Sequence, residues 1–134
     1  MSLHDEQSRE LLSAAARDEL TCRILRRDAE SPVEATLFHA QQTLEKGLKA
    51  VLVSRGIVFR RTHDLLELLE LAKANGLVVP ADYALLARLA PYAVEFRYIG
   101  VTSPTVSLEE AQVAVDAIMT WARAQIGVDE GNRS

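Results

Sequence analysis

The sequence predicts an all-α protein, an antiparallel helical bundle of about five helices, and three observations lead to this prediction. Apolar residues recur at helical spacing through most of the 134 residues. Two segments, SPVE and SLEE, carry a serine followed three residues later by a glutamate, a pattern typical of helix starts. Strand-like alternation is confined to a weak candidate at residues 56–59. Short connections between the helices then favour antiparallel neighbours.

The first helix is predicted over residues 5–27. Its apolar residues Leu12, Ala16, Leu20 and Ile24 recur four positions apart, which indicates one face turned toward a core. We therefore expect this helix to be amphipathic.

The second helix is predicted to begin with a capping box between Ser31 and Glu34, with Pro32 at the first helical position. It is predicted to end shortly before Gly56, a residue able to adopt the left-handed conformation. Gly47 lies in its middle, where glycine costs about 1 kcal/mol relative to alanine. A close crossing with another helix would explain that glycine.

The third helix is predicted to begin at residues 62–64, with Thr62 as its cap and Asp64 complementing the positive end of the helix dipole. It should end near Gly76. A fourth helical region opens at residues 80–82, is kinked or divided at Pro91, and ends near residues 97–98.

The last helix is predicted to begin with a second capping box, between Ser107 and Glu110, and to run to about residue 126. Its apolar positions are Val113, Ala117, Met119 and Trp121. The sequence thus predicts one bundle domain over residues 1–126 and a polar tail over residues 127–134.

The composition fits one soluble globular domain, with 49% hydrophobic and 25% charged residues. A net charge of −4 provides no global basic field for nucleic acid. Cys22 is the only cysteine, which excludes an intramolecular disulfide and fits a reducing cytoplasm. The N-terminus lacks the features of a signal peptide, and the most apolar later stretch, residues 83–94, is too short to span a bilayer. We expect a cytoplasmic protein without a membrane segment.

A polar stripe on the second helix is the most informative feature of the sequence. Gln42, Glu45 and Lys49 lie between Phe38 and Leu52 at helical spacing. On an exposed face, the pair of Glu45 and Lys49 would stabilise the helix by only about 0.2–0.5 kcal/mol. Since large apolar residues bracket the stripe, we expect it to lie at the margin of the buried face, where an unpaired charge is costly.

A partner for Glu45 is therefore expected from another helix, and Arg97 is the best candidate. Its guanidinium can bond a carboxylate through two parallel hydrogen bonds and stays charged in almost any environment. The sequence predicts a contact between Glu45 and Arg97.

His63 has two interpretations that the sequence leaves open. It is either a polar, exposed ring beside a helix cap or a titratable imidazole in a site. His4, His39 and His63 lack metal-ligand spacing, and no glycine-rich phosphate loop or nucleophile motif is present, so neither a metal nor a cofactor is predicted. A small basic loop, Arg55, Arg60 and Arg61, either touches a phosphate backbone or is only solvated.

Three segments of the chain together resemble the HEPN domain of prokaryotes. They are FHAQQTLEKGLKAVLVSRG, THDLLELL and YAVEFRY. The resemblance covers the chain from about its first helix to its last. It implies a helical bundle that is commonly a homodimer, often encoded beside a small nucleotidyltransferase. Many relatives are ribonucleases or toxins in which an arginine, and a histidine a few residues later, form a metal-independent site across the dimer.

This sequence departs from the ribonuclease pattern, because YIGVTSPTVSLEE after Arg97 contains no histidine. We therefore expect a nucleotide-, RNA- or partner-binding HEPN protein in a module with a nucleotidyltransferase, similar to a toxin–antitoxin pair. The ligand-binding residues that the resemblance implies are Gln42, Glu45, Lys49, His63, Asp64, Arg97 and Tyr98.

Two alternatives remain at this point. The first is a metal-independent endoribonuclease whose catalytic residues are His63 and Arg97. The second is a purely structural dimer in which the polar stripe only sets the helix register.

Overall fold

The computed structural model describes residues 2–93 and 106–127, and in these ranges the chain consists of helices and loops without a strand. The all-α prediction is thereby confirmed, and the weak strand candidate at residues 56–59 lies in a loop. The elements in chain order are α1 (Leu3–Arg27), α2 (Val33–Ser54), α3 (Leu65–Ala74), α4 (Tyr83–Leu89), the 3-10 helix η1 (Ala90–Ala93) and α5 (Leu108–Ile126).

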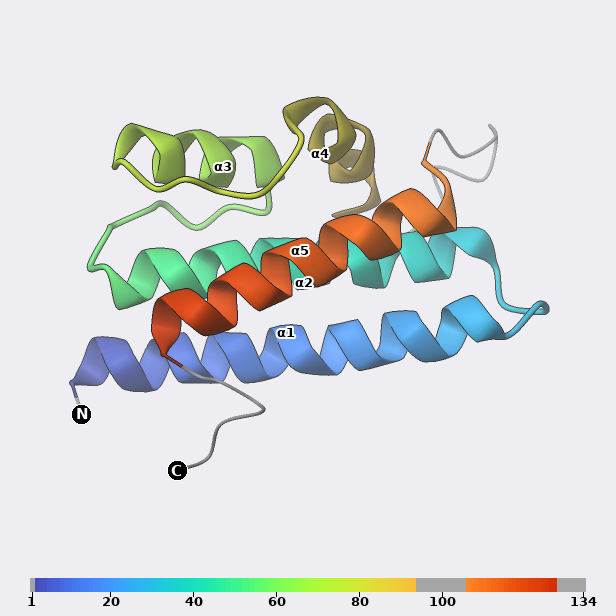
Figure 1. The fold of residues 1–134 in the computed structure, drawn as a ribbon, viewed down its shortest axis with the longest axis horizontal. Helices are drawn as coiled ribbons and strands as arrows, with labels where there is room; N and C mark the ends of the chain where they lie inside the picture. The colour runs from blue at the N-terminus through green and yellow to red at the C-terminus, as the bar shows by residue number, and fades with distance from the viewer. Residues whose placement is uncertain (1, 94–105, 128–134) are drawn as a thin grey trace.

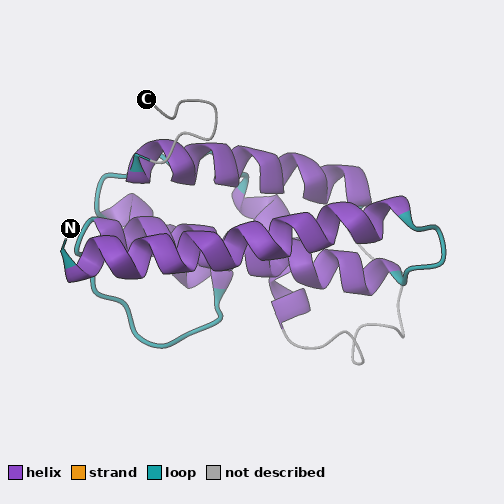
Figure 2. Ribbon diagram, turned by 90° about the horizontal axis from the view of Figure 1, so that it is seen from below, coloured by secondary structure: helices purple, strands orange, loops and turns teal. Residues whose placement is uncertain are grey.

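The three long helices α1, α2 and α5 run lengthwise along the bundle, and α1 is antiparallel to the other two (Figures 1 and 2). Helices α2 and α5 run in the same direction, because the segment with α3 and α4 carries the chain back between them. Helices α3 and α4 lie on the side of α2 opposite α1 (Figure 1). Helix α2 is thus the central element of the bundle. No helix in the described ranges has the length and apolar character needed to cross a membrane.

The predicted capping box at the start of α5 is confirmed. The Ser107 hydroxyl accepts a hydrogen bond from the Glu110 amide at 3.0 Å, and the Glu110 carboxylate accepts one from the Ser107 amide at 3.0 Å. Helix α1 begins in the same way, with Ser2 and Asp5 bonded reciprocally. These bonds satisfy backbone donors that the first helical turn leaves free.

The predicted capping box at the start of α2 is wrong. The capping residue is Pro32, and no side chain bonds the first amides of the helix. The Ser31 amide donates instead to the Asp28 carbonyl at 3.0 Å in the preceding turn, and the Ser31 hydroxyl has no hydrogen-bond partner among the described residues. Ser31 therefore lies one position too early to cap.

The buried face of α1 also differs from the predicted stripe. Leu12 is buried as expected, but Leu20 is 50% exposed and Ile24 is 58% exposed. Four residues of an α-helix turn through about 400°, which is about 40° more than a full turn. Side chains spaced four apart therefore shift around the helix at each step and leave the face that points to the core. The buried positions instead alternate steps of three and four, and they are Ser8, Leu12, Ala15, Glu19 and Cys22. In α5, Val113 is 68% exposed, because the buried face of this helix instead includes Ala111, Ala114 and Val115.

Helix α3 begins two to three residues later than predicted, because Asp64 and not Thr62 is its cap. The Asp64 carboxylate accepts hydrogen bonds from the amides of Leu66 and Glu67 at 3.1 and 3.2 Å. Thr62 accepts from the Asp64 amide and fixes the turn before the helix. The predicted division of the fourth helix at Pro91 is confirmed, since α4 passes there into η1, but its predicted end at residues 97–98 lies outside the described residues.

The close crossing predicted from Gly47 is confirmed. A Cβ atom at this position would lie 3.0 Å from Cγ2 of Ile118 and 3.7 Å from the sulfur of Met119, both in α5. Gly47 therefore lets α2 and α5 approach each other closely, which brings the middle of α2 into the centre of the bundle.

Candidate functional site

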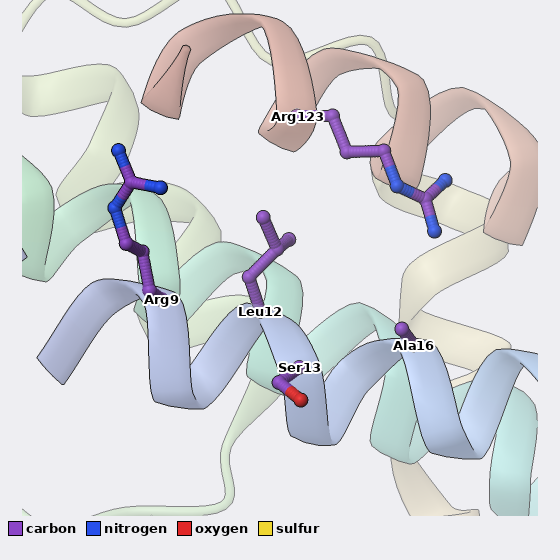
Figure 3. A pocket seen from close by; sticks show the side chains of 5 residues that line it. All are labelled: Arg9, Leu12, Ser13, Ala16 and Arg123. Atoms are coloured by element: carbon purple, nitrogen blue, oxygen red, sulfur yellow. The ribbon is translucent and has the colours of Figure 1, made fainter. Parts of the chain in front are cut away.

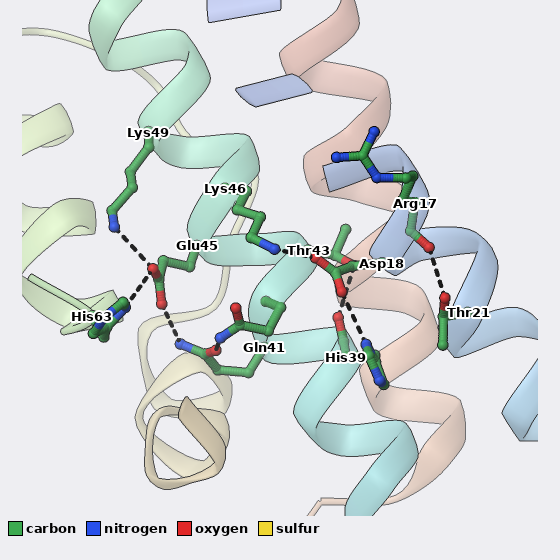
Figure 4. Close-up of polar contacts among 11 residues, drawn as sticks. Arg17, Asp18, Thr21, His39, Gln41, Thr43, Glu45, Lys46, Lys49 and His63 are labelled. Atoms are coloured by element: carbon green, nitrogen blue, oxygen red, sulfur yellow. Dashed lines mark hydrogen bonds and ion pairs between the residues drawn. The ribbon is translucent and has the colours of Figure 1, made fainter. Parts of the chain in front are cut away.

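The centre of the candidate site is the carboxylate of Glu45, in the middle of α2. Its side chain is only 3% exposed, although it carries a charge. Both carboxylate oxygens accept hydrogen bonds: Oε1 from Gln41 at 3.2 Å, and Oε2 from Lys49 and His63, each at 2.9 Å (Figure 4). A buried carboxylate is stable only when it is paired in this way. The polar stripe on α2 therefore lies in a partly dry environment, as the bracketing apolar residues predicted.

Gln41 is a site residue that the sequence reasoning left out of its candidate set. It is fully buried, and its Nε2 donates to Glu45 while its Oε1 accepts from Gln42 at 2.7 Å. The Gln41 amide must turn its NH₂ group toward Glu45, because an ionised carboxylate can only accept hydrogen bonds. Gln42, which was predicted, touches Glu45 only through Gln41. The sequence did contain a signal for this contact, because residues four apart in a helix, such as Gln41 and Glu45, are neighbours on its surface.

Lys49 and His63 connect the buried carboxylate to the surface. Lys49 lies one turn after Glu45 on α2, and its side chain is 14% exposed. His63 comes from the loop before α3, and its side chain is 72% exposed although its Nδ1 reaches Glu45. The turn made by Thr62 and Asp64 positions this imidazole. His63 is thus an exposed ring beside the cap of α3, as the first interpretation had it, and it also contacts Glu45; its role as a titratable imidazole in a site stays a prediction.

The pKa of Glu45 reflects two opposing effects. Burial raises it, but the hydrogen bonds from Lys49 and His63, the positive charge of Lys49 and the amide of Gln41 together outweigh burial, and the pKa lies below its ordinary value. Glu45 is therefore ionised at neutral pH. It acts as a fixed negative charge that orients its two basic neighbours.

The predicted partner of Glu45 lies outside the described residues. Arg97 and Tyr98 belong to the segment 94–105, so the contact between Glu45 and Arg97 stays a prediction. Asp64 is close to the site in sequence, but its carboxylate bonds the first amides of α3. Its place in the ligand-binding set also stays a prediction.

A second polar cluster joins α1 to the other side of α2. Asp18 of α1 accepts from Lys46 at 2.6 Å and contacts Nδ1 of His39 at 2.9 Å (Figure 4). The next residue of α1, Glu19, accepts a hydrogen bond from Arg123 of α5 at 2.7 Å. These ion pairs link the three long helices, and they explain the buried Glu19.

A shallow groove of about 280 Å³ lies between α1 and α5, near the pair of Glu19 and Arg123. Figure 3 shows its lining, with Leu12 and Ala16 between Arg9 and Arg123. None of the residues predicted for the site lines this groove. Within residues 2–93 and 106–127, no three histidine, cysteine, aspartate or glutamate side chains gather into a metal-binding group.

The comparisons with known proteins agree with this architecture. The family model of the HEPN domain matches residues 8–123. The crystal structure of an archaeal HEPN homologue superposes with a TM-score of 0.58 at 22% sequence identity, covering 89% of this chain and 97% of the homologue. At this identity the similarity supports the fold alone. A search of curated proteins gives no match. With a family model that extends from α1 to α5 and a solved homologue of the same fold, the chain belongs to the HEPN domain family.

Proposed function

We propose that this HEPN protein binds a nucleotide or an RNA phosphate at the cluster of Glu45, Lys49 and His63. The observation that carries the proposal is the exposed imidazole of His63 bonded through Nδ1 to a buried, ionised carboxylate. Glu45 holds one ring nitrogen, so the other, Nε2, remains for a ligand. Lys49 uses one of its three N–H donors on Glu45, which leaves further donors for the same ligand.

The charge of the cluster changes with the protonation of His63. When His63 is neutral, Glu45 and Lys49 cancel. When His63 is protonated, the cluster carries a net positive charge, and both ring nitrogens are donors. Since a phosphate oxygen only accepts, phosphate binding favours the protonated imidazole.

Calorimetric titration with AMP, a single nucleotide, tests this proposal. We expect the AMP affinity to fall in His63→Gln, because the phosphate loses the donor that the imidazole provides. Lys49→Gln should weaken AMP binding, whereas Lys73→Gln, which removes an exposed lysine of α3, is the matched control. Equal AMP affinity in the wild type and the His63→Gln variant would overturn the proposal.

An endoribonuclease is the second candidate, and the same contact favours it. A neutral His63 that donates through Nδ1 to Glu45 presents the lone pair of Nε2, which can accept a proton from a ribose 2′-hydroxyl. In this case Arg97 would stabilise the phosphate. Incubation of the protein with mixed RNA in the presence of a chelator distinguishes the candidates: cleavage that is lost in His63→Ala supports the enzyme. Absence of cleavage at high protein concentration argues against it.

The proposal also includes partners. We propose a homodimer and a module with a nucleotidyltransferase, similar to a toxin–antitoxin pair, as the resemblance of the sequence implies. The exposed Leu20 and Ile24, on successive turns of α1, are apolar residues that a partner would cover.

Sedimentation of the wild type and of the Ile24→Lys variant tests whether this surface takes part in dimerisation. Co-purification with a nucleotidyltransferase encoded beside this chain tests the module. A third possibility is a protein that only forms a structural dimer. In that case Lys49→Gln would change the dimerisation, and neither the wild type nor the variant would bind a nucleotide.

A further inference from the structure

We infer that the site takes a single-stranded oligonucleotide and not only one nucleotide, with a second subsite on the loop between α2 and α3. This inference rests on the proposed function for the phosphate that His63 binds. The second subsite is a groove for a base, together with Arg61 for the phosphate between the two subsites.

The base subsite is a groove of about 230 Å³ between the first turns of α1 and the start of the loop. Its lining includes His4 and Gln7 of α1, and Val58 and Phe59 of the loop. The His4 ring lies against Gly56, where its Cε1 is 3.8 Å from the position that a Cβ atom would occupy. An aromatic ring and apolar side chains with one amide at the rim suit a base, which stacks with its face and bonds with its edge.

Charge decides in which direction a strand would leave this groove. Along α1, the neighbouring hollow that shares Gln7 is lined by Glu10, which disfavours phosphate. Along the loop toward His63, Arg61 follows Phe59, whereas Arg55 precedes the loop at the end of α2. Arg61 is exposed without an ion-pair partner in the part of the chain that the structure describes, whereas Arg55 bonds the amide of Gln125 in α5. A polyanion would therefore follow the loop toward His63.

Arg61 and His63 are both exposed, and the residue between them, Thr62, is buried. The His63 ring stays 72% exposed while its Nδ1 lies against Glu45 of α2. By contrast, Arg60 is neutralised by Glu67, to which it donates at 2.7 and 2.5 Å. His63 is four positions after Phe59 in the chain, which limits their Cα distance to about 14 Å. A strand of a few nucleotides can therefore reach both subsites. Figure 1 shows the first turn of α1 and the end of α2 at the same end of the bundle, where the loop begins before it runs back along α2 to the start of α3.

Fluorescence anisotropy with a labelled RNA tetranucleotide, beside calorimetry with AMP, tests the inference. We expect Arg61→Gln to weaken tetranucleotide binding and to reduce the slope of log affinity against log salt by about 0.7, the value for one phosphate contact to a single strand. AMP binding should remain unchanged in Arg61→Gln. His4→Ala should weaken tetranucleotide binding at all salt concentrations without changing the slope. Arg27→Gln, which removes an exposed arginine at the opposite end of α1, is the matched control and should leave tetranucleotide affinity unchanged.

The outcomes separate the two proposals. If AMP binds through His63 but Arg61→Gln leaves the tetranucleotide slope unchanged, the second subsite is wrong and the proposed function stands. If the tetranucleotide depends on Arg61 and His4 but AMP does not depend on His63, the loop is the binding surface and the phosphate site at His63 is wrong. If the tetranucleotide does not bind at all, the inference is overturned.

Discussion

The Nδ1 atom of His63 lies 2.9 Å from Oε2 of Glu45, although the two side chains occupy opposite environments: 72% of the first and 3% of the second is exposed. A buried charge on the central helix thus controls a group at the surface. Lys49 shares the same oxygen, so the carboxylate holds two basic groups with one atom. The free-energy cost of burying Glu45 is therefore offset by the hydrogen bonds from its neighbours and by the positive charge of Lys49.

Lys49→Met should lower the free energy of unfolding by about 1–3 kcal/mol, because the buried carboxylate loses one of its donors while His63 and Gln41 remain. Urea denaturation measures this difference. Lys73→Met removes an exposed lysine of α3 and should change stability by less than about 0.5 kcal/mol. Equal losses in the two variants would mean that the contact of Lys49 with Glu45 contributes nothing.

The stability advantage of the wild type over Glu45→Gln should shrink in acid. Burial raises the pKa of Glu45, but its hydrogen bonds outweigh burial and place the folded pKa below the ordinary value of 4.5. The folded state therefore binds fewer protons than the unfolded state, and the stabilisation is complete above pH 4.5 and is lost as the pH falls through the folded pKa. Urea midpoints between pH 3 and 6 test this, and a difference that grows on acidification would contradict it.

Asp64→Ala should destabilise the protein by about 0.5–2 kcal/mol, because two amides at the start of α3 lose their acceptor. Thr62→Ala should cost less, since its hydroxyl accepts only the Asp64 amide. Thermal denaturation of both variants distinguishes the observed cap from the one that the sequence predicted. A larger loss in Thr62→Ala would restore the original prediction.

Gly47→Val should destabilise the bundle by about 1–3 kcal/mol through overpacking against Ile118 of α5. Ala124→Val introduces the same side chain on the exposed face of α5, where it should cost only the difference in helix propensity between alanine and valine. Chemical denaturation provides the comparison. Because valine has a higher helix propensity than glycine, a Gly47→Val variant at least as stable as the wild type would indicate that α2 and α5 can separate at this crossing without cost.

Local signals predicted the helices well because they depend on neighbouring residues. The capping box of Ser107 and the close approach at Gly47 were both predicted and are both present. The errors arose where a local signal was ambiguous by one or two residues. Ser31 matches the capping pattern but takes part in the preceding turn, and Thr62 and Asp64 are both suitable caps.

The site was predicted less completely, because its contacts join residues that are distant in sequence. Periodicity placed Glu45 and Lys49 together at the margin of the core, and the structure agrees. The contact with His63 depends on the path of the loop before α3, which helical periodicity does not describe. The four-residue spacing that includes Leu20 and Ile24 likewise did not show that these two side chains lie away from the core face of α1.

The most direct test of the account is the tautomer of His63, read from the ¹⁵N chemical shifts of its ring by nuclear magnetic resonance at a pH where the ring is neutral. If Glu45 accepts from Nδ1, the neutral ring carries its proton on Nδ1 and leaves Nε2 for a ligand. We expect this tautomer in the wild type and its loss in Glu45→Gln. A wild-type ring with its proton on Nε2, unchanged in Glu45→Gln, would contradict the account.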